Sequence, residues 1–276
     1  FMGLSLLAAS FLVGLVGLST SPAGAQPLAG DPSSQNMIGM GVNVRHFGYD
    51  ISLWREHAIT KIGQQKKSPL LNTLLLSGTP GKFRNFQSIS LGIIKDPREI
   101  KVMNERLPGS KPFVIEKINH SVCAHVAVGK VYVISERQSR SDLGLHITLA
   151  GQIPLNYSWP LYIWLYQPAP LTDGYVPVAY DPKVHNVALV GGNARYSAGF
   201  ADGYITPGIG ASMSFSAEWG SYRNASNRLS VGLSADKFVK NLPIWHRSEM
   251  NRNFFPALFV TFAAGFESKS KSTKRP

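Results

Sequence analysis

The chain has a single cysteine, Cys123, among its 276 residues. An internal disulfide is therefore excluded, and hydrogen bonding and packing must hold the fold. Long apolar runs are equally scarce. Residues 4–18 form one, and no uncharged apolar run after residue 25 reaches the ~20 residues that a membrane-spanning helix needs. If the mature chain lies in a membrane, it does not cross it as a bundle of helices.

The apolar run at residues 4–18, LSLLAASFLVGLVGL, is followed by SPAGAQ, which places small residues at Ala23 and Ala25. This pattern is typical of a secretory signal peptide, so we expect residues 1–25 to be removed. An uncleaved membrane anchor is the alternative. Residues 26–36 are then predicted to be an N-terminal linker.

Acidic residues are also few: 16 Asp and Glu stand against 28 Lys and Arg, for a formal net charge of +12. A basic chain can bind nucleic acid. An exported one more often meets anionic lipid, peptidoglycan or an acidic protein partner. We therefore expect no nucleic-acid partner. The basic segment ESKSKSTKRP, residues 267–276, is predicted to be a disordered tail.

The sequence does contain many stretches in which apolar and small polar residues alternate. In PGIGASMSFSAEW, residues 207–219, Met213 and Phe215 share one face while Ser212 and Ser214 share the other. The same period predicts strands at 37–46, 85–95, 120–135, 142–153, 159–167, 205–219, 226–240 and 255–266, with shorter candidates at 50–56 and 70–78. No convincing amphipathic helix is indicated between them.

Alternation alone does not tell which face meets water, because soluble barrels bury the apolar face and transmembrane barrels expose it. Residue identity favours the second case. The polar face carries mainly Gly, Ser, Ala, Asn and His, while charges gather in connections such as KDPREIKVMNER and SERQSRSD. We predict an all-β fold over residues 37–266: a closed antiparallel up-and-down transmembrane β-barrel of about 8 strands, or 10 with both short candidates. A soluble periplasmic β-protein is the alternative.

Aromatic residues favour the membrane as well. Ten of them lie near predicted strand ends, where membrane barrels carry aromatic girdles: Tyr157, Trp159, Tyr162, Trp164, Tyr166, Trp219, Tyr222, Trp245, Phe254 and Phe255. The last predicted strand ends at Phe266, similar to the terminal aromatic signal of outer-membrane barrels, although ten residues follow it. We predict the cell outer membrane as the location, with its lipids as partners.

Four segments carry a family resemblance. They are FQSISLGIIKDPREIKVMNE at 86–105, KPFVIEKIN at 111–119, YDPKVHN at 180–186 and FVTFAAGFESK at 259–269. In this order they resemble an uncharacterised family of outer-membrane β-barrel proteins of Bacteroidota, over roughly residues 36–268. The resemblance implies a barrel with a cleaved signal and no catalytic residues. Residues 57–80 and 191–199 fit it less well, which predicts specialised loop surfaces.

Two histidines are the leading candidates for chemistry. His125 and His146 lie on adjacent predicted strands with the same facing, near Cys123 and Thr148. They could shuttle protons or ligate a metal, and interior polar packing is the alternative. Inward acids are scarce, Glu218 being the clearest, so a hydrolase is not expected. We assign no catalytic, cofactor-binding or metal site.

The connections suggest contact with the cell envelope, and the lumen is expected to be filled. In KDPREIK, Lys95, Arg98 and Lys101 are expected on an exposed turn that could touch anionic headgroups or cell wall. A barrel of about eight strands is filled by side chains or holds one small ligand, so a general porin is not expected. We expect folded loops, or inward Arg45 and Lys237, to fill the lumen.

YDPKVHN lies in the long predicted connection 168–204. Asp181 before Pro182 is first a turn signal. A ligand or partner site formed by Asp181, Lys183 and His185 is the alternative.

The function predicted from these features is a structural or partner-docking role in the outer membrane, accessory to an envelope assembly, secretion or surface machine. No enzyme activity and no cofactor are expected. The alternatives are an outer-membrane lipid-modifying enzyme that uses His125 or His146, and a small barrel that binds a hydrophobic ligand.

Overall fold

The structure, a computed structural model, describes residues 36–58, 83–107, 109–135, 142–168, 174–222 and 225–268. The predicted signal peptide, nearly all of the predicted linker, the short candidate strand at 70–78 and most of the predicted tail lie outside these residues. Within them, no helix has the length and apolar character to cross a membrane.

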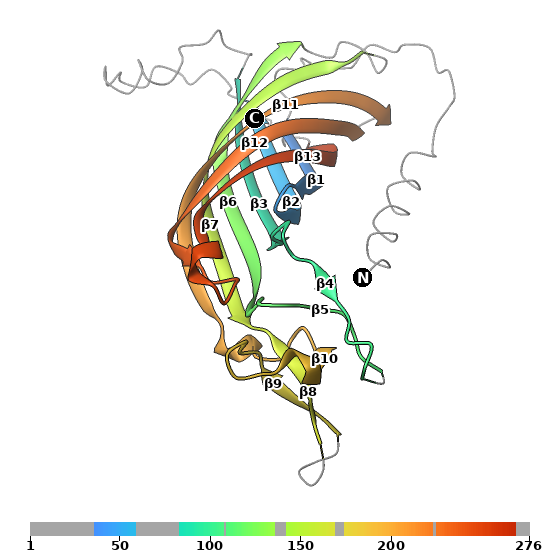
Figure 1. Cartoon of the computed structure of the whole chain (residues 1–276). Helices are drawn as coiled ribbons and strands as arrows, with labels where there is room; N and C mark the ends of the chain where they lie inside the picture. The colour runs from blue at the N-terminus through green and yellow to red at the C-terminus, as the bar shows by residue number, and fades with distance from the viewer. Residues whose placement is uncertain are drawn as a thin grey trace, which may run out of the picture.

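Eight long strands close into one antiparallel barrel (Figure 1). They are β1 (Asn36–Arg45), β2 (Gly48–Ala58), β3 (Phe83–Ile94), β6 (Asn119–Ser135), β7 (Gly144–Pro160), β11 (Tyr204–Tyr222), β12 (Ala225–Leu242) and β13 (Arg252–Ser268). Each strand pairs with the one before and after it in this order, and β1 pairs with β13 to close the sheet. The predicted all-β, up-and-down barrel of eight strands is confirmed.

Alternation within each strand places side chains in turn inside and outside the barrel. In β12, Ser230 and Ser234 are buried while Val231 and Leu233 are exposed. The same exposure of apolar side chains recurs around the barrel, at Ile38, Met40, Ile51, Leu53, Ile89, Leu91, Val126, Val128, Leu149, Ile153, Met213, Phe215, Leu258 and Val260. The barrel therefore has an apolar outer face and a polar interior, the opposite of a soluble barrel.

The other described elements gather at one end of the barrel, opposite the end where β1 begins and β13 ends (Figure 1). We name these the loop end and the terminal end. The loop end contains β4 (Lys101–Val102) paired with β5 (Phe113–Val114), and a sheet of β8 (Tyr162–Gln167), β9 (Gly174–Ala179) and β10 (Val190–Asn193). It also contains the short 3-10 helices η2 (Val187–Leu189), η3 (Phe200–Asp202) and η4 (Ser248–Met250).

Residues 159–167 are the main departure from the predicted strand set. β7 stays paired with β6 up to Pro160, which lies opposite Asn119. Pro160 has no N–H to donate and ends this ladder, after which β8 pairs with β9 and β10 instead of with the barrel. The eighth barrel strand is β2, which extends the short candidate at 50–56 in both directions.

Two apolar clusters hold the loop end together. One lies where β6, β12 and β13 meet the loop end and consists of Val114, Cys123, Phe238, Leu242, Ile244, Trp245 and Phe255. The second lies beneath the three-stranded sheet and consists of Phe113, Leu161, Ile163, Tyr180 and Val190. Phe113 and Val114 are neighbours in β5, so this short strand contributes to both clusters. The loop end is thus a packed assembly.

Gly39 of β1 permits a close approach inside the barrel. A Cβ at this position would lie 2.4 Å from the Trp54 ring and 2.5 Å from the Ala264 carbonyl oxygen. Gly151 of β7 is a matched control, because a Cβ there would meet nothing within 4 Å.

We expect Gly39→Ala to lower the free energy of unfolding by about 1–3 kcal/mol, the usual cost of overpacking. Gly151→Ala should leave it unchanged or raise it slightly, because alanine restricts the unfolded chain more than glycine does. Urea titration in lipid vesicles, followed by gel mobility without boiling, measures both variants. Equal destabilisation of the two would contradict the packing described for Gly39.

Candidate functional site

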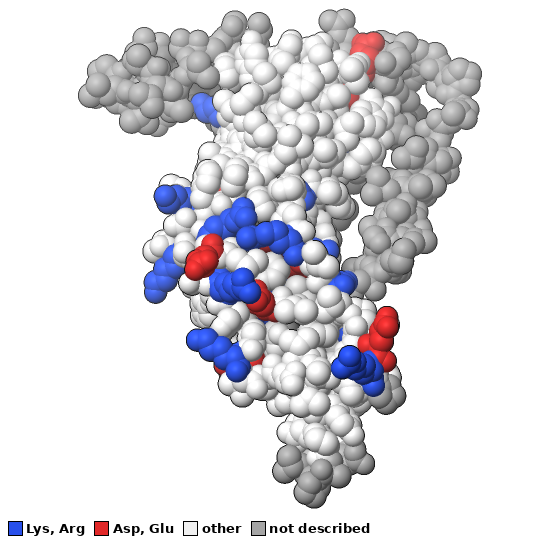
Figure 2. All heavy atoms as spheres, in the orientation of Figure 1, with Lys and Arg blue, Asp and Glu red and all other residues white. Residues whose placement is uncertain are grey.

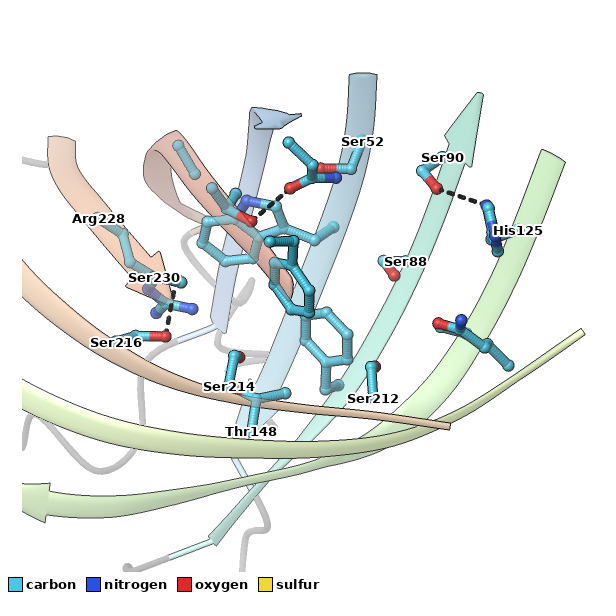
Figure 3. Close-up of a pocket in the computed structure, with 18 of the residues that line it drawn as sticks. Ser52, Ser88, Ser90, His125, Thr148, Ser212, Ser214, Ser216, Arg228 and Ser230 are labelled. Atoms are coloured by element: carbon cyan, nitrogen blue, oxygen red, sulfur yellow. Dashed lines mark hydrogen bonds between the residues drawn. The ribbon is translucent and has the colours of Figure 1, made fainter. Parts of the chain in front are cut away.

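The centre of the lumen is lined mainly by small hydroxyl side chains. Serines point inward from several strands (Figure 3): Ser52, Ser88, Ser90, Ser212, Ser214, Ser216 and Ser230. Together with Thr148 they border a cavity of about 100 Å³. That volume suits a few water molecules, whereas drug-sized ligands occupy pockets of roughly 300 Å³ or more. The lumen is therefore largely filled, as expected for eight strands.

A buried ionic cluster lies on the terminal side of this cavity. Arg228 of β12 donates two hydrogen bonds to the carboxylate of Glu56 of β2. The same guanidinium lies 2.9 Å from Oε2 of Glu218. Arg84 Nη1 lies 3.6 Å from Glu56 Oε2, and His146 Nε2 lies 3.3 Å from Glu218 Oε2. The cluster therefore joins two carboxylates to two guanidinium groups and one imidazole.

This ionic cluster connects strands that are not neighbours in the sheet. Arg228 and Glu56 come from β12 and β2, which are separated by β13 and β1. The Trp54 ring lies 4.6 Å from the Arg228 guanidinium and covers it on one face. Charges held away from water are costly unless each has its partner, so the members of the cluster depend on one another.

Removing one partner of the Arg228–Glu56 pair should cost more than removing both. We expect Arg228→Gln to lower the free energy of unfolding by about 3–5 kcal/mol, because Glu56 is left buried without its main partner. Adding Glu56→Gln should restore part of that loss. Arg55→Gln, an exposed neighbour on the same strand as Glu56, is the control and should change stability by less than about 0.5 kcal/mol. Urea titration of wild type, Arg228→Gln, the double variant and Arg55→Gln tests this. A double variant with a lower free energy of unfolding than Arg228→Gln would contradict the pairing.

A second polar cluster lies on the loop side of the cavity. Arg45 of β1 lies 2.6 Å from Asp50 and 3.8 Å from Asp236, so it bridges acids of β2 and β12. Asn43 also donates to Asp50. The prediction that Arg45 faces the lumen is confirmed. The prediction for Lys237 is wrong: Lys237 is exposed, because the parity of β12 turns Asp236 inward instead.

The two candidate histidines both face the lumen but belong to different clusters. In the register of β6 with β7, His125 lies opposite Pro154 and His146 lies opposite Val133. The two histidines are thus separated along β7 by eight residue positions, roughly 25 Å at the usual strand rise. The structure does not bring them together as a pair. No group of three or more His, Cys, Asp and Glu in the described ranges could hold a metal ion.

His125 lies in a line of groups with the composition of a hydrolase triad. Its Nδ1 lies 3.4 Å from Ser90 Oγ (Figure 3), and its Nε2 lies 3.2 Å from Asp236 Oδ2. Cys123 Sγ is 3.6 Å from the same Nε2, and Gln152 donates to Asp236. In a serine hydrolase, Nε2 faces the serine and Nδ1 faces the acid, so the ring here has the reverse orientation. Ser90, His125 and Asp236 thus form a hydrogen-bonded network inside the lumen.

The predicted aromatic girdle is only partly present. Phe254 is exposed, but Trp159, Trp245 and Phe255 are buried. Trp159 donates its indole N–H to the Tyr196 carbonyl at 3.0 Å, inside the loop end. These rings lie near strand ends as predicted, yet the loop end covers them.

KDPREIK forms a turn at the loop end, as predicted, although Asp96 within it is buried. Arg98 donates to both carboxylate oxygens of Asp96 at 2.9 and 2.7 Å, and Trp245 donates at 3.3 Å. Burial by itself would raise the pKa of Asp96, but the hydrogen bonds from Arg98 and Trp245 outweigh it and lower the pKa to about 2. The ionised carboxylate ties this turn to the connection between β12 and β13.

YDPKVHN also forms a turn, as predicted. Lys183 donates its backbone N–H to Asp181 Oδ1 at 2.9 Å, and Asp181 donates its backbone N–H to His185 Nδ1 at 3.1 Å. The side chains of Asp181 and His185 therefore stabilise the turn, while Lys183 is exposed.

The outer wall of the barrel has the surface of an outer-membrane-type barrel. Exposed apolar side chains such as Phe215, Val231 and Val260 lie side by side on β11, β12 and β13. Figure 2 shows few charged side chains on the upper part of one face, with Lys and Arg gathered across the middle and below. Such a wide apolar surface around a polar interior is the pattern of a transmembrane barrel. It is the surface that the predicted location in an outer membrane requires.

Comparisons with known proteins give the following. No protein-family model and no curated protein matches the chain. Among solved structures, it is similar to Neisserial surface protein A (NspA), with a TM-score of 0.38 and 8% identity over 89% of this chain and 100% of that one. It is also similar to a major outer membrane protein from Thermus thermophilus, with a TM-score of 0.42 and 7% identity over 85% of this chain and 98% of that one. Membership of the Bacteroidota family stays a prediction.

Proposed function

We propose that the chain is an outer-membrane barrel with a structural, partner-docking role, accessory to an envelope assembly, secretion or surface machine. The lumen is filled by serines and two polar clusters, which supports a barrel that holds the chain in the membrane rather than one that conducts solutes. A packed loop end supports a defined surface for a partner.

An apolar patch on the loop end is the observation that carries this proposal. Met103, Val184 and Val187 are 54%, 74% and 40% exposed. Asn104 Nδ2 donates to the Ala188 carbonyl at 2.8 Å, so the connections that bear Met103 and Val187 are held together. These side chains lie in connections beyond the barrel strands. An exposed apolar patch of this kind favours a protein partner.

The patch can be tested by co-purification. We expect the tagged chain, extracted in mild detergent, to bring a reproducible companion that mass spectrometry identifies. The double variant Met103→Ser and Val187→Ser should bring down about tenfold less of this partner protein than the wild-type chain does. The reason is that interface anchors commonly contribute more than 1 kcal/mol each to binding.

A matched control is the double variant Ile205→Ser and Val239→Ser, which removes two exposed apolar side chains from the barrel strands instead. It should keep the companion. A wild-type chain that purifies alone, or equal losses in the two double variants, would contradict the docking role.

We further propose that the chain is not an enzyme. The reversed orientation of His125 between Ser90 and Asp236 supports this. So does a cavity of about 100 Å³, which is small for a lipid substrate. The small volume and hydroxyl lining also disfavour a carrier of a hydrophobic ligand.

The rival function, a lipid-modifying enzyme, predicts a chemical change in the envelope. We expect Ser90→Ala, His125→Ala and His146→Ala to leave the lipid composition of the envelope unchanged, as mass spectrometry of extracted lipids would show. Gel mobility without boiling reports whether each variant still forms the barrel. A folded variant that alters acyl chains or headgroups would sink the non-catalytic proposal.

A further inference from the structure

Basic side chains gather where the barrel meets the loop end (Figure 2). They are exposed and come from two connections and the adjoining strands: Lys95, Arg98, Lys101, Lys237, Lys240, Arg247 and Arg252. Their position at the margin of the apolar wall distinguishes them from the basic residues of the distal loops.

Lys237 lies within the edge of the apolar wall itself. On the outer face of β12 it is opposite Ile209 of β11 and Phe254 of β13. These two apolar neighbours are 71% and 48% exposed. An ammonium flanked by lipid-facing side chains leaves the hydrocarbon by extending to the headgroup layer. Lys237 therefore marks the level at which headgroups meet the barrel.

Arg252 follows Lys237 on the neighbouring strand, and Lys95 is connected to Arg252 through Phe47 of the β1–β2 turn. Arg252 is two positions from Phe254, the partner of Lys237, on the same outward face of β13, and beyond a register shift it pairs with Leu242. Its guanidinium lies 5.6 Å from the centre of the Phe47 ring. Lys95 donates its backbone N–H to the Phe47 carbonyl at 2.9 Å. We name Lys95, Lys237 and Arg252 the basic rim.

The positive charge of the basic rim is not neutralised by the protein. Its three members form no ion pair within the part of the chain that the structure describes. Two acids of the adjoining connections are already paired: Asp96 with Arg98 at 2.7 Å and Glu116 with Arg247 at 2.9 Å. Glu249 is a further exposed acid in the same region. One such acid against the three basic side chains of the rim leaves an excess of positive charge.

We propose that the basic rim binds the phosphates of anionic membrane lipid headgroups. Ammonium and guanidinium groups are the donors that proteins use for phosphate. The apolar wall beside the rim, at Ile209 and Phe254, is placed to contact the acyl chains of the same lipid. This continuity favours a lipid phosphate over a soluble one. The inference depends on the transmembrane setting and not on the docking role.

The experiment compares two triple variants of the full chain. The rim variant carries Lys95→Gln, Lys237→Gln and Arg252→Gln. The control carries Lys111→Gln, Lys183→Gln and Arg195→Gln, three exposed basic residues of the distal loop end. Both variants lose the same charge. Each is reconstituted with phosphatidylcholine containing a minor fraction of phosphatidylglycerol, and native mass spectrometry counts the anionic lipid retained after extraction.

We expect wild type and control to retain phosphatidylglycerol alike, and the rim variant to bind it roughly fivefold more weakly for each charge removed. Equal losses in the two triple variants, or none in the rim variant, would overturn the proposal. Displacement of the lipid by millimolar inorganic phosphate would also overturn it, since the rim would then be a site for a soluble anion.

Gel mobility without boiling separates this result from a failure of the barrel. If the rim variant does not form the heat-modifiable band, Lys237→Gln alone is compared with Lys183→Gln in the same assay, with about a fivefold difference expected. Absence of that band in the wild-type chain would count against the transmembrane setting and hence against the proposed function as well.

Discussion

Closure of the sheet between β1 and β13 is the constraint on which the rest of the structure depends. Inside a bilayer no water satisfies backbone N–H and C=O groups, so a sheet there must have no free edge. The ladder from Asn36 opposite Ser268 to Arg45 opposite Phe259 removes that edge. Once the sheet is closed, strand alternation sends every second side chain into a narrow lumen and the others outward. The apolar wall and the small polar interior are two results of the same closure.

Because the lumen is narrow and filled, other molecules can bind only to the outer surfaces of the barrel. Serines suit its crowded centre, and the charges at its two sides are held by partners from other strands, as in Arg228 with Glu56 and Arg45 with Asp236. These contacts join strands that are not neighbours in the sheet and fill the space through which a solute would pass. The surfaces that remain for other molecules are the packed loop end and the margin where the apolar wall meets basic side chains.

Much of the fold follows from local pattern, and the rest requires register. Alternation around Phe215 predicts both the strand and its outward face. β2 is harder to see, because Asp50 and Glu56 make it look like a charged connection. Both acids are accommodated inside because arginines from other strands pair with them, and local spacing does not show such pairs. Likewise, parity correctly turns His125 and His146 inward, but only the pairing of β6 with β7 shows that they lie far apart.

The stability of Val231→Arg in a bilayer tests the central claim, that the apolar wall faces lipid, most directly. Val231 is exposed near the middle of β12, between Phe215 of β11 and Val260 of β13. If lipid surrounds it, the substitution should lower the free energy of unfolding in lipid vesicles by about 2–4 kcal/mol. A change within about 0.5 kcal/mol, as for an exposed residue in water, would contradict a membrane-spanning barrel.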